Sequence, residues 1–167
     1  MKIIKAPNEV NFDKPALFLS GSIEMGDATK WQDMVVVMIA QWDEVNKRNG
    51  GKEWIGQILN PRRDDWDRTW EQSIENPQFK EQVEWELEGL ENSDYVYMHF
   101  DPNTKSPITL MELGMMKDKK KLIVNCGEEF WRQGNVEVFC SYYGTPLFHS
   151  IEESIEQLCR SYLNMRI

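Results

Sequence analysis

The sequence has few cysteines and no long apolar run. The three cysteines, Cys126, Cys140 and Cys159, are widely spaced and include no Cys-x-x-Cys pair, a pattern that favours neither a disulfide framework nor a zinc site. No apolar stretch reaches the roughly 18 residues of a membrane span, and residues 1–11 lack the apolar core of a signal peptide. These absences predict a protein of the reducing cytoplasm whose cysteines act as small buried hydrophobes.

Basic residues and histidines are also scarce. The 19 lysines and arginines face 28 aspartates and glutamates, which gives a formal net charge of −9. A surface of this sign repels nucleic acid polymers and anionic membranes, so neither is expected as a partner. The two histidines, His99 and His149, form no recognisable Ser-His-Asp or Cys-His arrangement, and we interpret His99, within an apolar strand, as structural.

Apolar residues are present in the amount and order typical of one α/β domain. The chain of 167 residues is 41% hydrophobic, which fits a single domain over residues 1–167. Short apolar runs alternate with helical periodicity, a pattern that favours right-handed crossovers. We therefore predict a flavodoxin/Rossmann-like three-layer sandwich with a mostly parallel sheet of about five strands. The predicted strands lie near residues 16–19, 55–59, 95–100, 122–124 and 147–148, and the helices near 31–45, 77–90, 107–117 and from 150 onward.

In such a sheet, ligands bind beyond the carboxyl ends of the strands. The turns expected there are Ser20–Asp27, Asn60–Trp66 and Asp101–Thr109.

Two of the predicted helices begin at a capping residue followed by proline, at Asn76-Pro77 and at Ser106-Pro107. The charged segment between the second strand and the next helix is predicted to be a long functional loop.

Glu86 occupies a helix position where an apolar residue is expected. It comes three residues after Val83 and four before Leu90, on a helix whose apolar stripe also includes Phe79 and Leu87. A buried carboxylate is costly unless it is paired or neutralised. This position therefore predicts a functional carboxyl group.

Glu112 has the same relation to the next helix. It comes four residues after Ile108 and three before Met115, on a predicted inner stripe that also includes Met111. Two such carboxyls on successive helices indicate a shared site, in which their pKa values are pushed apart to give one nucleophile and one proton carrier. The alternative interpretation is that each glutamate is a solvated residue at a helix margin.

Two turns contain candidate anion-binding groups. Gly21 and Ser22 follow the first predicted strand and can present backbone N–H groups to an anion, although the turn is neither a Walker loop nor a dinucleotide fingerprint. Asn60 is followed by Pro61 and the adjacent pair Arg62 and Arg63, which is a candidate clamp for phosphate or carboxylate. The alternatives are a plain tight turn and a solvated loop balanced by nearby aspartates. Nearby Trp66 is a candidate for stacking on a base or for core packing.

Four short motifs occur in sequence order, at Phe18–Ile23, Asn60–Arg63, Gln82–Glu86 and Ser106–Gly114. They read Phe-Leu-Ser-Gly-Ser-Ile, Asn-Pro-Arg-Arg, Gln-Val-x-Trp-Glu and Ser-Pro-Ile-Thr-Leu-x-Glu-Leu-Gly. Together they resemble the nucleoside 2-deoxyribosyltransferase superfamily, from about residue 17 to residue 124. The resemblance is closest to a bacterial and phage branch, related to the 2′-deoxynucleoside 5′-phosphate N-hydrolases.

The resemblance implies roles for individual residues. Glu112 matches the glutamate that attacks the anomeric carbon. Glu86, eight residues before Asp94, matches the acid/base position, where the family has the shorter aspartate. Ser106 matches a serine that touches the 5′-phosphate in the nucleotide-hydrolysing relatives, which favours a nucleotide substrate.

Two positions depart from the family pattern. Phe18 stands where the family has a tyrosine, and Glu24 stands where the nucleotide hydrolases have an arginine. Arg62 or Arg63 would then supply the charge that a phosphate requires. The predicted substrate-binding residues are Phe18, Gly21, Ser22, Asn60, Arg62, Arg63, Trp66, Asp94 and Ser106.

The resemblance implies an enzyme that cleaves or transfers at the N-glycosidic bond of a (deoxy)nucleoside or nucleotide. The reaction would pass through a covalent glycosyl-glutamate intermediate and would require no metal and no cofactor. A homodimer or larger homo-oligomer is also implied, with a neighbour's residues closing the pocket. Two other functions stay open: a sensor of a nucleotide- or NAD-derived ligand that uses the same pocket, and an interaction protein that uses exposed tryptophans.

Overall fold

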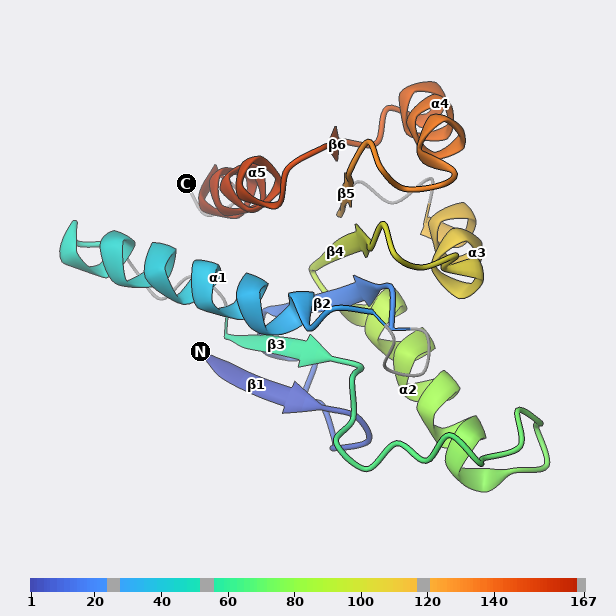
Figure 1. Cartoon of the computed structure of the whole chain (residues 1–167). Helices are drawn as coiled ribbons and strands as arrows, with labels where there is room; N and C mark the ends of the chain where they lie inside the picture. Colours follow the sequence, from blue (N-terminus) through green and yellow to red (C-terminus); the bar gives the residue numbers. More distant parts are fainter. Residues whose placement is uncertain (24–27, 52–55, 117–120, 165–167) are drawn as a thin grey trace.

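Helices and strands alternate along most of the chain (Figure 1). The computed structural model describes residues 1–23, 28–51, 56–116 and 121–164, with side chains described as far as Ser161. Glu24, and the predicted element ends at Ile55 and Lys117, lie outside the described residues. The elements are β1 Lys2–Lys5, β2 Ala16–Gly21, α1 Trp31–Arg48, β3 Gln57–Asn60, α2 Pro77–Asn92, β4 Tyr95–Phe100, α3 Pro107–Met116, β5 Leu122–Cys126, α4 Gln133–Tyr143, β6 Leu147–Phe148 and α5 Ile151–Asn164.

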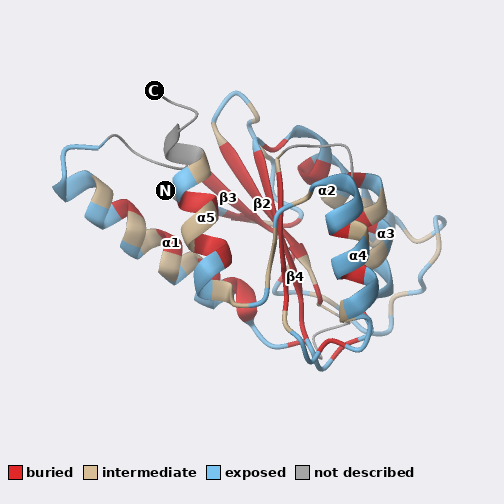
Figure 2. Ribbon diagram, turned by 90° about the horizontal axis from the view of Figure 1, so that it is seen from above, coloured by how far each residue is buried: buried red, intermediate tan, exposed pale blue. Residues whose placement is uncertain are grey.

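The strands form one six-stranded parallel sheet in the order β1-β3-β2-β4-β5-β6. Helices α1 and α5 cover one face, and α2, α3 and α4 cover the other (Figure 2). The predicted three-layer α/β arrangement with a parallel sheet is therefore confirmed. The sequence analysis missed β1, because its only apolar residues are Ile3 and Ile4 between two lysines, too short a run to show a periodicity.

Alternate residues of the central strands pack on opposite faces, as the pleat of a strand requires. Phe18 of β2 and Met98 of β4 belong to the core under α2, α3 and α4. Leu17 and Tyr97 belong to the core under α1 and α5. Ser20 shares the even-numbered face with Phe18, so its side chain points toward the helices that contain the two glutamates. The three cysteines are buried and unpaired, as predicted.

The chain crosses from one side of β2 to the other between β3 and β4, so β2 and β4 meet at a topological switch point. Gly21 pairs with His99 at the carboxyl ends of these strands. Its φ is +146°, and a Cβ atom there would lie 2.3 Å from the carbonyl oxygen of His99, so only glycine fits this close approach. A switch point is where open α/β sheets bind their ligands.

The two cap-proline pairs begin helices where they were predicted to do so. The side chain of Asn76 accepts hydrogen bonds from the backbone N–H groups of Gln78 and Phe79, at 3.1 and 3.2 Å, and α2 starts at Pro77. Helix α3 starts at Pro107. Residues 61–76 between β3 and α2 form turns and bends without a helix, as expected for a long loop.

The predicted apolar stripes are partly wrong. On α2, Leu87 is 41% exposed, and on α3 the residues Ile108, Met111 and Met115 are 57%, 63% and 39% exposed. The buried face of α3 consists of Thr109, Glu112, Leu113 and Met116. Since α3 is apolar on nearly all sides, its sequence has too little polar contrast to indicate which face is buried.

Candidate active site

The side chains of Glu86 on α2 and Glu112 on α3 are brought into one site. The charge of Glu86 contributes to the raised pKa of Glu112, so the two carboxyl groups are close enough to interact. Both helices cover the same face of the sheet. The prediction that these two residues interact therefore agrees with the structure. The apolar residues of α3 that were predicted to share the buried face with Glu112 are, however, exposed.

Glu112 is 8% exposed. Its Oε2 accepts a hydrogen bond of 2.8 Å from the hydroxyl of Ser20, at the carboxyl end of β2. Burial, and then the charge of Glu86, raise the pKa of Glu112 to about 8, while the bond from Ser20 opposes the rise. Burial disfavours the charged form because the interior solvates a carboxylate poorly.

Glu86 is half-buried. Its Oε1 accepts a hydrogen bond of 2.7 Å from the amide of Gln82, one helical turn earlier. Burial raises the pKa of Glu86 to about 7, and the bond from Gln82 opposes the rise. The site therefore contains two carboxyl groups that both resist ionisation.

Such a pair holds its protons in common, because ionisation of one carboxyl disfavours ionisation of the other. One neutral and one charged carboxyl is the state that a nucleophile and an acid together require. The pKa of both carboxyls is raised, and the predicted roles place the proton on Glu86.

Buried hydroxyl groups join the turn after β2 to the turn after β4. The hydroxyl of Ser22 is in close hydrogen-bonding contact with that of Ser106 and accepts a bond of 2.9 Å from the backbone N–H of Asp101. The hydroxyls of Ser106 and Thr104 lie 2.6 Å apart. Ser106 has a φ of 50°, a value uncommon outside glycine and typical of functional turns. Two predicted substrate-binding residues, Ser22 and Ser106, are thus brought together beside the start of α3.

Arg62 ties the end of β3 to the segment before α1. Its guanidinium donates hydrogen bonds to the carbonyl oxygens of Ala28 and Thr29, at 3.0–3.3 Å. Its backbone N–H donates to the side chain of Asn60 at 3.0 Å. Arg62 and Asn60 therefore form part of the framework beyond the carboxyl end of β3.

Arg63 contacts acidic and aromatic side chains of its own loop and of α2. Its buried guanidinium makes a two-pronged contact with Asp65 at 2.7 and 3.0 Å, lies 3.6 Å from Glu81 and packs 5.0 Å from the ring centre of Trp70. The acidic neighbours raise its pKa. The predicted phosphate clamp thus gains no support at Arg63, whose charge is already balanced inside the protein.

Two predicted substrate-binding residues, Phe18 and Asp94, make contacts within the protein. Phe18 is 1% exposed, and its ring packs against Gly89 and, with centroids 6.0 Å apart, against Trp85. Asp94 precedes β4, at the amino edge of the sheet, where its carboxylate accepts a bond of 2.7 Å from the backbone N–H of Ala16. Both residues make structural contacts, and their role in substrate binding stays a prediction.

Trp66 lies in the loop between β3 and α2. It is half-buried, and its ring meets Trp70 edge-on with centroids 5.1 Å apart. Its indole nitrogen is buried and has no hydrogen-bond partner among the described residues. Trp66 is therefore held by packing, and its place near substrate stays a prediction.

Ser20 and Gln82, which donate hydrogen bonds to the two carboxyls, were not among the predicted site residues. Both lie inside the quoted motifs, and Gln82 stands four residues before Glu86, the spacing at which helix side chains meet. His99 is buried against Trp31, with ring centroids 4.9 Å apart, and lies 2.6 Å from the side chain of Asn125. Burial lowers its pKa, which agrees with a structural histidine.

Within the described residues, no cluster of three or more His, Cys, Asp or Glu side chains has metal-binding geometry. No helix within the described ranges is long and apolar enough to span a membrane.

The fold and the site define a parallel α/β protein with an interacting carboxyl pair near its switch point. The chain belongs to the family described as nucleoside 2-deoxyribosyltransferase like, whose model matches residues 14–130, a range that includes Ser20, Gln82, Glu86 and Glu112. Membership indicates an enzyme of the nucleoside deoxyribosyltransferase type, and chemistry at the N-glycosidic bond of small-molecule nucleosides.

A solved structure shares the fold. It is a conserved protein from Enterococcus faecalis V583, with a TM-score of 0.56 and 11% sequence identity, and the match covers 92% of this chain and 99% of that one. At this identity the likeness shows the architecture alone. No curated protein matches the sequence.

Proposed function

We propose that the protein cleaves or transfers at the N-glycosidic bond of a (deoxy)nucleoside or nucleotide, through a covalent intermediate on Glu112. The observation that supports this proposal is the interacting pair of buried carboxyls, Glu86 and Glu112, within the region matched by the family. A retaining glycosidic mechanism uses two such groups about 5 Å apart, one as nucleophile and one as acid/base.

In the first step, one carboxylate oxygen of Glu112 attacks the anomeric carbon. The carbon–nitrogen bond breaks, and its electron pair leaves with the base, which takes a proton from Glu86. Ser20 donates to Oε2 of Glu112, so Oε1 is the oxygen with its lone pairs available for attack. The product is a glycosyl ester of Glu112.

In the second step, Glu86, now ionised, removes a proton from water or from an incoming base. The activated oxygen or nitrogen attacks the anomeric carbon, the ester bond breaks, and Glu112 returns as a carboxylate. Burial of both carboxyls contributes because interactions with the developing positive charge of the sugar are stronger in a low-dielectric site. The residues assigned to this cycle require neither a metal nor a cofactor.

For a nucleotide substrate, we place the phosphate near Ser22 and Ser106. These residues bring two hydroxyls and the turn at Gly21 together beside the start of α3, and hydroxyl and N–H donors suit phosphate oxygens. The guanidinium groups of Arg62 and Arg63 are bonded to protein oxygens. We therefore expect the hydroxyl and backbone N–H donors, rather than these two arginines, to be the main groups that bind the phosphate.

The decisive experiment is a panel of nucleosides, nucleotides and NAD, with and without an acceptor base, analysed by chromatography for released or exchanged base. A sensor of a nucleotide- or NAD-derived ligand would bind a member of the panel and release no base. An interaction protein would bind none, which thermal-shift measurements would show. Base release by the wild-type protein that is lost in Glu112→Gln would support the proposed enzyme.

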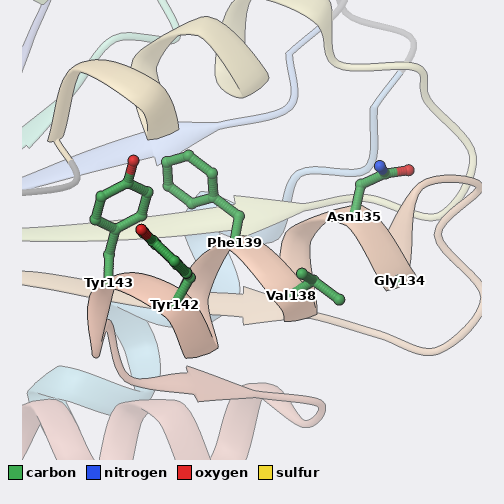
Figure 3. A pocket seen from close by; sticks show the side chains of 6 residues that line it. All are labelled: Gly134, Asn135, Val138, Phe139, Tyr142 and Tyr143. Atoms are coloured by element: carbon green, nitrogen blue, oxygen red, sulfur yellow. The ribbon is translucent and has the colours of Figure 1, made fainter.

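We further propose one domain over residues 1–167, a cytoplasmic location, no nucleic acid polymer or membrane partner, and a homodimer or larger assembly. A single sheet that includes both β1 and β6 supports one domain. Exposed apolar side chains on α4 support self-association: Val138 and Tyr142 are 70% and 81% exposed and border a shallow groove (Figure 3). The only charged residue of α4 is Glu137, so two acidic chains can approach here with little repulsion.

A further inference from the structure

Both N–H groups of the Gln82 side-chain amide donate hydrogen bonds. Gln82 is 4% exposed. Its Nε2 donates one hydrogen bond of 2.7 Å to Oε1 of Glu86 and another of 2.8 Å to the backbone carbonyl of Pro61, just after β3. A glutamine amide has two N–H donors, so both are used.

The carbonyl of Pro61 determines which way this amide faces. A backbone carbonyl can only accept hydrogen bonds. If the amide turned over, Oε1 of Gln82 would face that carbonyl, and the bond would be lost. In the present orientation, Oε1 of Gln82 is buried without a hydrogen-bond partner among the described residues, which is unfavourable. The hydrogen bond to the carbonyl of Pro61 nevertheless keeps the amide in this orientation. Because that bond does not involve Glu86, the orientation is the same whether Glu86 is protonated or ionised.

An oxygen that always receives an N–H bond is a poor place for a proton. The proton of neutral Glu86 therefore belongs on Oε2. We infer that Gln82, held by Pro61, is a positioning residue that directs the exchangeable proton of Glu86 to Oε2 and so toward the leaving base. This inference rests on the proposed function for its consequence in turnover, whereas its effect on Glu86 can be measured without a substrate.

Glu112 differs, because its donor is the hydroxyl of Ser20. A hydroxyl rotates and can accept as well as donate, so Ser20 can follow a change in the charge of Glu112. Among the described residues, Glu112 on α3 is the charged group that interacts with Glu86, and Arg63 on the loop after β3 is balanced by Asp65 and Glu81. Among these, Glu112 is the group whose own titration must be separated from that of Glu86.

The test compares Gln82→Met and Gln82→Leu with the control Gln78→Leu. Methionine keeps the length of glutamine and removes both donors, and Gln78 is an exposed residue one turn earlier on α2. Glutamate side chains labelled with carbon-13 would be titrated by NMR in a Glu112→Gln background, and the Glu86 signal identified by its absence in Glu86→Gln. Loss of the donor should raise the pKa of Glu86 by about one unit or more, and Gln78→Leu should leave it unchanged.

A crystal structure at atomic resolution, below pH 6, gives a second measurement, because the longer carbon–oxygen bond marks the protonated oxygen. Oε2 should be that oxygen in the wild-type protein. A proton on Oε1, or an unchanged pKa in both folded Gln82 variants, would overturn the inference.

Activity supplies the third measurement. On an active substrate, the Gln82 variants should move the alkaline limit of the pH profile upward and lower kcat more than they change KM, because binding stays intact while the proton is misdirected. A raised Glu86 pKa in a protein that turns over no substrate would refute the proposed function and leave the role of Gln82 standing.

Discussion

The two halves of the site hold their carboxyls differently. Glu86 lies on α2, a helix rich in charged residues, and is bound by an amide whose orientation the backbone determines. Glu112 lies on α3, a short apolar helix, and is bound by a hydroxyl that can rotate. A group that delivers and recovers a proton benefits from a donor of constant orientation. A group that alternates between carboxylate and ester benefits from a partner that adapts.

The largest expected effect comes from removing the nucleophile. Glu112→Gln preserves the shape of the side chain and cannot form the glycosyl ester, so turnover should fall by about a thousandfold or more. Steady-state release of base from the active substrate measures this loss. Near-normal turnover in a folded Glu112→Gln protein would show that another residue is the nucleophile.

Glu86→Gln should slow natural substrates by about 10²–10⁴-fold, because a poor leaving group needs its proton. The alkaline limb of the pH profile, which reflects loss of that proton, should flatten. With a nitrophenyl glycoside of the matching sugar, departure needs little protonation, so a first burst of nitrophenol should remain.

The glycosyl-enzyme should then persist in this variant, because no base activates water, and mass spectrometry should detect the added sugar. Loss of the burst in a folded variant that still binds substrate would make Glu86 a positioning residue. Comparison of Glu112→Gln with Glu86→Gln therefore distinguishes the nucleophile from the acid/base.

Ser106→Ala and Arg63→Ala test which groups recognise a phosphate. Loss of the Ser106 hydroxyl should raise KM for a nucleotide by about tenfold and change KM for the matching nucleoside much less. Arg63→Ala should affect both substrates alike and lower Tm, since it leaves Asp65 and Glu81 without their partner. If Arg63→Ala instead raised KM for the nucleotide alone, the hypothesis that Arg63 binds the phosphate would be supported.

The smallest effect concerns stability. Glu86 and Glu112 have folded-state pKa values of about 7 and 8, above the ordinary 4.5. Their contribution to stability is therefore fully present below about pH 4.5 and is lost as the pH rises through 7 and 8. Glutamine does not ionise, so Glu112→Gln should be more stable than wild type at pH 8 and should have a higher Tm there.

The Tm difference should be much smaller at pH 5, and scanning calorimetry at the two pH values measures it. The matched variant Glu86→Gln should show a Tm change of the same sign. A Glu112→Gln protein that is less stable than wild type at pH 8 would show that the ionised carboxylate is stabilised by its surroundings, against the pKa direction.

Local patterns in the sequence determined the α/β class, the parallel sheet, the start of α2 at Pro77 after the capping residue Asn76, and the choice of Glu86 and Glu112 as candidate site residues. These features depend on short-range periodicity and capping, which neighbouring residues establish by themselves. Strand β1 escaped detection because two isoleucines between lysines form too short a pattern. Glu112 was identified although the stripe around it was assigned to the wrong face, since on an apolar helix the carboxylate is the residue that stands out.

Only the tertiary structure decided what each of these residues meets. Arg63 turns onto Asp65 and Glu81, Phe18 packs under α2, and Asp94 binds the amino edge of the sheet, whereas Gln82 and Ser20 reach the carboxyls. The order of the strands and the path of the loop after β3 determine these pairings. The contacts of Phe18, Asp94 and Ser20 join residues far apart in the sequence, and periodicity within one element contains no information about a partner on another. Gln82 and Glu86, by contrast, meet within one helix.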